Sequence, residues 1–131
     1  MLNTLITSRN VLAIAALIGF ASVAIGAFAA HGLKHILSHQ ALLWMDTGVK
    51  YQMLHGGVLL ILAFALRQWP NWVAVQWACV SFMLGILLFS GSLYIMAASQ
   101  IKALGMITPI GGIALLVGWL CLLVASFKQP Q

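Results

Sequence analysis

Three histidines, His31, His35 and His39, recur at steps of four residues, a spacing that could support metal binding. Imidazole is a common ligand of zinc and copper, and two histidines four residues apart on a helix can share an ion. At a rise of 1.5 Å per residue, the third lies about 12 Å from the first and cannot join the same shell. No Cys, Asp or Glu stands at ligand spacing to complete the coordination. We therefore expect a polar face of interfacial histidines and no metal site.

Polar side chains also occur inside the apolar stretches of the sequence, where an ionisable residue is a functional candidate. The candidate binding cluster consists of His31, Gln52, His55, Ser90, Ser92, Tyr94 and Thr108. Counted along the expected helices, all of them lie within about 12 Å of the membrane surface on the side of the first loop. Because lipid cannot hydrogen-bond these groups, we predict a shared polar pocket in that leaflet. The alternative is that they bond one another and simply hold the helices together.

An enzyme with a serine nucleophile needs a histidine beside the serine, and here Ser90 or Ser92 could pair with His55. Such an enzyme also needs a residue that orients the imidazole, and the sequence has no acidic residue placed to do so. It also lacks the GxSxG elbow of the α/β-hydrolases. We therefore expect no catalytic residues and no cofactor.

The composition indicates what kind of protein holds these residues in place. The chain has 131 residues, enough for one domain, of which 63% are hydrophobic and 5% are charged. Soluble domains carry about 25% charged residues, and the mean hydropathy here is +1.09. These values exclude a soluble enzyme and a disordered tail. The net charge of +5 includes a single acidic side chain, Asp46, and suits loops beside anionic headgroups. We expect membrane lipids, and not nucleic acid, as partners.

Four apolar segments are long enough to span a bilayer, which takes about 20 helical residues. They run from about 10 to 30, 48 to 66, 72 to 98 and 102 to 127. Strands are not expected, because polar and apolar residues do not alternate with a period of two. The sequence predicts an all-α integral membrane protein, a four-helix bundle that forms a single transmembrane domain over residues 1–131.

The first segment has two interpretations. Arg9 could begin a signal peptide, but the apolar run of about 20 residues is longer than the usual 7 to 15. Small residues recur at spacings of three and four: Ala15, Gly19, Ser22, Gly26 and Ala30. They would lie on one helix face and allow close packing, so we predict a retained helix. The two cysteines, Cys79 and Cys121, lie in apolar runs and are predicted to be small core residues.

Residues 33–45 are too few to span the membrane. Leu33, Ile36, Leu37, Ala41 and Trp44 share one helical face, which predicts a short amphipathic helix lying on the membrane surface between the first two spans. Asp46 and Lys50 follow at a spacing of four residues, which suits a helical ion pair.

Glycines and one proline are expected to shape the helix contacts. The structural candidates are Gly26, Gly56, Gly57, Gly91, Pro109, Gly111 and Gly112. Pro109 lacks an N–H, so we expect a continuous but kinked fourth helix. The alternative is that Thr108 caps a helix that begins at Pro109, which would leave residues 103–107 irregular.

Short connections predict antiparallel neighbours, and four crossings put both termini on one side. That side carries Arg9, Arg67 and Lys128, and the other side carries three lysines. This is nearly a tie under the positive-inside rule, and we expect cytoplasmic termini. Tryptophans near the predicted boundaries suit the membrane interface, whereas Trp119 lies deeper and is expected to pack in the bundle or against lipid.

The polar residues fall in four strings. These are GAFAAHGL at residues 26–33, TGVKYQMLH at 47–55, LFSGSLY at 88–94 and TPIGG at 108–112. With these strings in this order, nearly the whole chain resembles the YgdD-like family of small membrane proteins of unknown function, which is related to eukaryotic TMEM-type proteins. The resemblance implies four transmembrane helices and, for bacterial members, the inner membrane. It implies no particular substrate.

Two functions fit these features. The first is a non-enzymatic bundle that binds a lipid or protein partner through the polar pocket and forms a homo-oligomer. The alternative is a small transporter or channel subunit for a proton, a metal ion or a small solute, with His55 as the binding or protonatable group.

Overall fold

The computed structural model describes residues 2–128, which form helices joined by short connections. The elements are α1 (Leu2–Leu5), α2 (Ser8–His31), α3 (His39–Gln68), α4 (Val73–Ser99), the 3-10 helix η1 (Lys102–Met106) and α5 (Thr108–Phe127). Four segments are long and apolar enough to cross a membrane: α2, α3, α4 and residues 102–127. The predicted all-α membrane protein with four spans is confirmed.

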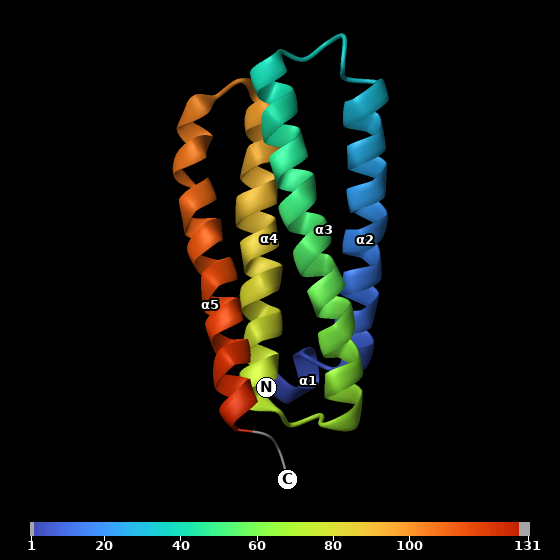
Figure 1. Cartoon of the computed structure of the whole chain (residues 1–131), viewed down its shortest axis with the longest axis vertical. Helices are drawn as coiled ribbons and strands as arrows, with labels where there is room; N and C mark the ends of the chain where they lie inside the picture. Colours follow the sequence, from blue (N-terminus) through green and yellow to red (C-terminus); the bar gives the residue numbers. More distant parts are fainter. Residues whose placement is uncertain (1, 129–131) are drawn as a thin grey trace.

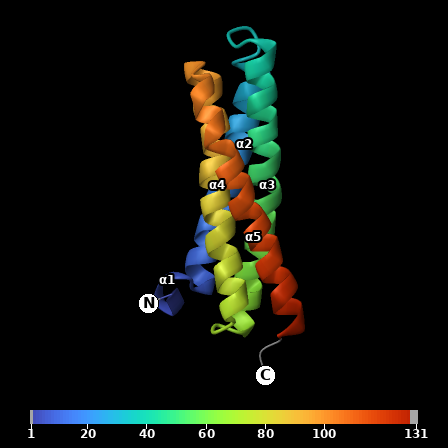
Figure 2. The same cartoon turned by 90° about the vertical axis from the view of Figure 1, so that its left-hand side faces the viewer.

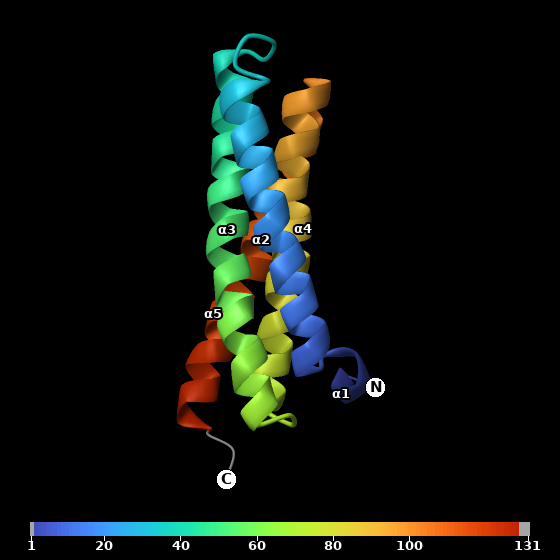
Figure 3. The same ribbon diagram turned by 90° about the vertical axis from the view of Figure 1, so that its right-hand side faces the viewer.

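The four long helices stand in a row rather than in a closed bundle. Figure 1 shows α2, α3, α4 and α5 side by side in chain order, and helix packing is concentrated between sequence neighbours. Both ends of the described chain lie at the same end of the molecule, as an even number of crossings requires. Figures 2 and 3 show the row from its two edges. In consequence α3 and α4 are central, whereas α2 and α5 are outer helices with most of their surface exposed.

The first span packs against α3. Thr7 caps α2 by accepting a hydrogen bond from the Asn10 amide at 3.2 Å. Of the predicted small-residue face, Ala15 and Ser22 are buried. The first segment therefore packs against the rest of the domain, and its retention in the mature protein stays a prediction.

The predicted interfacial helix over residues 33–45 is wrong. Ser38 caps α3 by accepting from the Ala41 amide at 3.2 Å, so residues 39–45 are the first turns of the second span. Before them the chain makes turns, in which the Leu37 amide donates to the Leu33 carbonyl at 2.9 Å. Leu33 and Leu37 pack on a small buried cluster that includes Ala97 of α4. Leu33 and Leu37 of the predicted apolar face are therefore partly covered by protein, whereas Ile36 of the same face is exposed.

The ion pair predicted after this segment is confirmed. Lys50 Nζ lies 2.6 Å from Asp46 Oδ2, and both side chains are exposed. An exposed pair of this kind contributes at most about 1 kcal/mol to stability.

The preferred interpretation of the fourth span, a continuous kinked helix, is wrong. Residues 102–106 form a 3-10 helix, and the α-helix begins at Thr108. Pro109 then lies in the first turn, where an N–H would have no helical acceptor in any case. The alternative was right about the break but wrong about the cap. The Thr108 hydroxyl bonds Ser92 on α4, and no side chain caps the helix.

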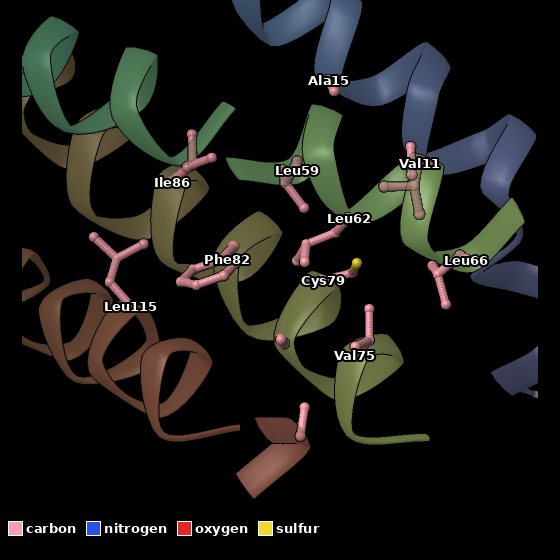
Figure 4. Packing of buried hydrophobic residues seen from close by; sticks show 13 residues of the cluster. Val11, Ala15, Leu59, Leu62, Leu66, Val75, Cys79, Phe82, Ile86 and Leu115 are labelled. Atoms are coloured by element: carbon pink, nitrogen blue, oxygen red, sulfur yellow. The ribbon is translucent and has the colours of Figure 1, made fainter. Parts of the chain in front are cut away.

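A single apolar cluster joins α2, α3, α4 and α5 in the half of the molecule that holds the termini (Figure 4). Leu59, Leu62 and Leu66 of α3 face Val75 and Phe82 of α4. Cys79 is fully buried in this cluster, as predicted, and Cys121 packs against it.

Only some of the glycines expected to shape the contacts do so. A Cβ on Gly111 would lie 2.7 Å from Phe89 Cα, and a Cβ on Gly56 would lie 2.6 Å from Ile18 Cγ2. Gly26 and Gly112 have room for an ordinary contact, at 3.4 and 3.8 Å from the nearest side-chain atoms. The expectations for Gly57 and Gly91 are wrong, because nothing lies within 4 Å of a Cβ there.

Three other glycines, none of them among the candidates, are as tightly packed. A Cβ on Gly48 would lie 2.6 Å from the Tyr94 ring, and one on Gly118 would lie 2.5 Å from the Phe82 ring. A Cβ on Gly85 would meet the Leu115 side chain. Five glycines therefore sit where a neighbouring helix leaves no room for a methyl group.

Candidate functional site

His55 lies deeper than the sequence indicated. It follows the first residue of α3, His39, by 16 positions, which is about 24 Å along the helix axis. The expected depth of about 12 Å assumed that the second span begins near Gly48. Because α3 begins nine residues earlier, His55 lies near mid-height of the helix row. The residues predicted to share one depth are spread from the loop side to the centre of the molecule.

The ring of His55 is held at both nitrogens and is almost fully buried. Its Nδ1 lies 2.7 Å from the Tyr51 carbonyl oxygen, and its Nε2 accepts from Trp119 Nε1 at 3.1 Å. A carbonyl only accepts and an indole N–H only donates, so this pattern assigns the neutral tautomer with the proton on Nδ1. A second proton on Nε2 would face the indole N–H. His55 could therefore bind a proton or a metal only after Trp119 moves away.

Trp119 is the site residue that the sequence reasoning missed, because it was expected only to pack in the bundle or against lipid. The signal that could have found it is chemical: an indole N–H inside a membrane needs an acceptor, and few side chains in these spans can accept. The rings of Trp119 and Phe82 are 5.5 Å apart, and the rings of His55 and Phe82 are 5.3 Å apart. Three helices meet at this aromatic cluster.

Gln52 forms a second network between α2, α3 and α4. Its Nε2 donates to the Ile18 carbonyl at 3.2 Å, and its Oε1 accepts from the Tyr94 hydroxyl at 2.8 Å. Nearby, the buried Ser90 hydroxyl donates to the Gly48 carbonyl at 2.7 Å. Two side chains of α4 thus bond α3: Tyr94 bonds a side chain of α3, and Ser90 bonds the backbone of α3.

Ser92 and Thr108 form a third network, which joins α4 to α5. Their hydroxyl oxygens are 2.7 Å apart, and Ser92 Oγ also donates to the Phe89 carbonyl at 2.9 Å. Among the described residues, neither Ser90 nor Ser92 is bonded to His55, so the pairing that a serine nucleophile needs is not formed.

His31 lies outside these networks. It is exposed at the end of α2, and His35 and His39 are exposed too. Within residues 2–128 no group of three or more His, Cys, Asp and Glu side chains is placed to hold a metal ion. The polar residues thus pair locally across helix interfaces and do not line one common pocket.

The hollow nearest to His55 is an apolar groove of about 470 Å³ between α3, α4 and α5. Its lining includes Leu54, His55, Phe89, Ile113, Leu116 and Trp119. Leu54, Ile113 and Leu116 are each more than half exposed on the outer surface of the helix row, so the groove opens sideways. It is called the His55 groove below.

The chain is similar in sequence to several bacterial membrane proteins. A family described as "Protein of unknown function (DUF423)" matches residues 25–112. The "UPF0382 membrane protein" of Haemophilus influenzae is 49% identical over 92% of this chain and 95% of its own length. The "UPF0382 inner membrane protein YgdD" of Escherichia coli K12 is 40% identical over 95% of both chains. The "UPF0382 membrane protein SH2409" of Staphylococcus haemolyticus is 45% identical over 82% of this chain and 86% of its own length. No solved structure matches. This chain therefore belongs to the DUF423 (UPF0382) family and is a multi-pass protein of the bacterial inner membrane.

Proposed function

We propose that this protein is a non-enzymatic helix assembly that binds a membrane lipid by seating an acyl chain in the His55 groove. The observation that supports the proposal is the groove itself, a hollow of about 470 Å³ beside a histidine whose hydrogen bonds are already satisfied. The groove is lined mainly by Leu, Ile, Phe and Trp, and Tyr51 is the one side chain with a polar group in its described lining besides His55 and Trp119. Such a groove offers water few partners, because a stable buried water needs two to four polar contacts.

The position of the groove favours an acyl chain over other occupants. His55 and Trp119 lie near the middle of α3 and α5, so the groove opens at the level of the hydrocarbon core. At that depth the surrounding solvent consists of lipid tails. The groove also lies against α5, an outer helix beyond which residues 2–128 form no further helix.

The hydrogen-bonded residues have a supporting role in this proposal. Gln52 bonds Tyr94 and joins α3 to α4, and Ser92 bonds Thr108 and joins α4 to α5. These two pairs hold together the helices that form the groove, and they are not part of its lining. The hydrogen bond from Trp119 to His55 also holds the groove in shape, because it joins α5 to α3. Fixed walls lower the entropy that binding has to overcome.

The test fills the groove with a larger side chain. Leu116→Trp adds an indole to the groove lining, and Leu123→Trp places the same indole on α5 outside that lining. Both leucines are more than half exposed, so both variants should fold. The proteins are purified in a mild detergent, and native mass spectrometry counts the phospholipids retained per protein.

We expect the wild type and Leu123→Trp to retain lipid equally, and Leu116→Trp to lose most of it. Wild-type protein that retains no lipid, or equal retention in both variants, would contradict the proposal. A second copy of the chain is the competing occupant. If it fills the groove, wild-type protein is dimeric and Leu116→Trp converts it to monomers without changing the lipid count.

A further inference from the structure

Two arginines from different helices line one cavity at the end of the molecule that holds the termini. Arg9 is the second residue of α2, and Arg67 is the last but one residue of α3. They border a hollow of about 290 Å³ together with Thr7, Ser8, Leu66 and Pro70. Figures 1 and 3 show the start of α2 and the turn between α3 and α4 at the same end of the row. This hollow is called the arginine cavity below.

The arginine cavity has an excess of positive charge that the chain's side chains do not balance. The sequence has one acidic side chain, Asp46, and that carboxylate lies 2.6 Å from Lys50 near the other end of α3. The N-terminal end of α2 also borders the cavity, and the helix dipole places partial positive charge there. No acidic side chain is therefore available to neutralise the two guanidinium groups.

The walls of the arginine cavity are held in place by side-chain amides. Asn10 Nδ2 donates to the Leu5 carbonyl at 3.0 Å, which fixes the bend between α1 and α2. Gln76 Nε2 donates to the Pro70 carbonyl at 2.8 Å, which fixes the turn on the opposite wall. Gln76 is fully buried in an otherwise apolar part of α4, and its Oε1 has no partner among the described residues. Burying a polar amide among apolar side chains costs free energy unless the amide is hydrogen-bonded. The bond from Gln76 to Pro70 offsets part of this cost and holds the turn in one position.

The depth of the arginine cavity in the membrane is indicated by two tryptophans. Trp69 and Trp72 belong to the same turn, and their rings pack edge to face at 5.6 Å. Tryptophans gather at the level of the lipid headgroups, where the ring is half apolar and the N–H is solvated. The two arginines thus lie at the ends of their spans, at the height of lipid phosphates.

We propose that the arginine cavity binds a phosphate group, and that its source is the headgroup of an anionic phospholipid. Guanidinium groups match phosphate oxygens with paired hydrogen bonds, and two of them from separate helices can hold one phosphate. The site lies at a different depth from the His55 groove and does not depend on the function proposed for it.

The test titrates full-length protein, stripped of lipid in a non-ionic detergent, with short-chain phosphatidylglycerol. Phosphatidylcholine and inorganic phosphate are the comparison ligands. Arg9→Gln and Arg67→Gln each remove one guanidinium, and Arg9→Lys keeps the charge without the paired geometry. Lys34→Gln and Lys102→Gln are the matched controls, because each removes one positive charge on the opposite side of the membrane.

We expect each Arg→Gln change to weaken phosphatidylglycerol binding about tenfold, as loss of a charge-assisted hydrogen-bond pair does, and Arg9→Lys to weaken it by less. The lysine controls should stay within about twofold of the wild type, because exposed charges at that distance are screened. Equal losses in the lysine and arginine variants would overturn the proposal, since general surface charge would then explain the binding.

Two further results separate the alternatives. If inorganic phosphate binds and needs both arginines, while phosphatidylglycerol binding does not depend on them, the phosphate site is supported but its source is free phosphate and not a lipid. The arginine changes are repeated in the Leu116→Trp background, where the His55 groove is filled, and there each Arg→Gln change should still weaken phosphatidylglycerol binding. Failure of the groove proposal and failure of this one are therefore distinguishable. Where an Arg→Gln variant elutes as an aggregate, the Arg9→Lys and lysine variants still decide the outcome.

Discussion

The two halves of the helix row are held together by different forces. On the loop side, α3 and α4 are joined by hydrogen bonds from Gln52 to Tyr94 and from Ser90 to Gly48. On the side of the termini, the same two helices meet through Leu62, Cys79, Phe82 and their neighbours (Figure 4). Lipid tails are as apolar as leucine, so burial alone does not drive helices together. The apolar half must depend on shape, whereas the polar half depends on specific partners.

The largest effect should come from the apolar half. Phe82 is fully buried, touches the Gly118 backbone and packs on both His55 and Trp119, so Phe82→Ala leaves a cavity where three helices meet. We expect a loss of about 3 kcal/mol in the free energy of unfolding, near the lower end for buried phenylalanines. Unfolding in mixed SDS micelles measures it. Phe64→Ala, at a residue that is 59% exposed, is the control and should be close to neutral. Equal losses would show that this half is not held by shape.

A smaller effect should come from adding one methyl group where two backbones approach. A Cβ on Gly111 would clash with the backbone of Leu88 and Phe89, which has no side-chain freedom with which to move away. We expect Gly111→Ala to cost about 1–3 kcal/mol of unfolding free energy, as overpacked sites do. Gly112→Ala is the matched control, because its nearest atom is 3.8 Å away. If the two variants unfold alike, the backbones of α4 and α5 are not in close contact at Gly111.

The smallest effect should come from the polar half, and a double-mutant cycle is needed to see it. Gln52→Met and Tyr94→Phe each remove one partner of the 2.8 Å bond. Interhelical bonds in membranes average about 0.6 kcal/mol, so we expect a coupling energy of about that size between the two sites. Ser99→Ala replaces Tyr94→Phe in the control cycle, because the Ser99 hydroxyl bonds its own helix at Ile95. Coupling of the same size in both cycles would mean that the Gln52–Tyr94 bond has no special role.

Much of the fold could be predicted from the sequence because membrane spans are set by length and hydropathy alone. The four spans, the burial of Gln52, His55, Ser90 and Ser92, and the family relationship all followed from residue types and order. The start of α3 could not be predicted in this way, because the turn before it depends on the Ser38 cap and on contacts with α4. Amphipathic spacing is the same whether an apolar face meets lipid or protein.

The details of the site escaped prediction for a related reason. Spacing placed the polar residues on helices, but it could not show which neighbour each would bond. Gly57 and Gly91 have the same residue type as Gly111, and only the crossing of α4 and α5 distinguishes them. Trp119 reaches His55 from another helix, 64 residues further along the chain. The residue pattern of one helix does not show which residues of another helix it will contact.

The order of the helices in the row has a consequence for biosynthesis. Because the main interfaces join α2 to α3, α3 to α4 and α4 to α5, each can form as soon as the second helix of the pair enters the bilayer. No span has to wait for a distant part of the chain before it finds its neighbour, which keeps the contact order low. We therefore expect the nascent chain to leave few helices unpaired while the ribosome completes the rest.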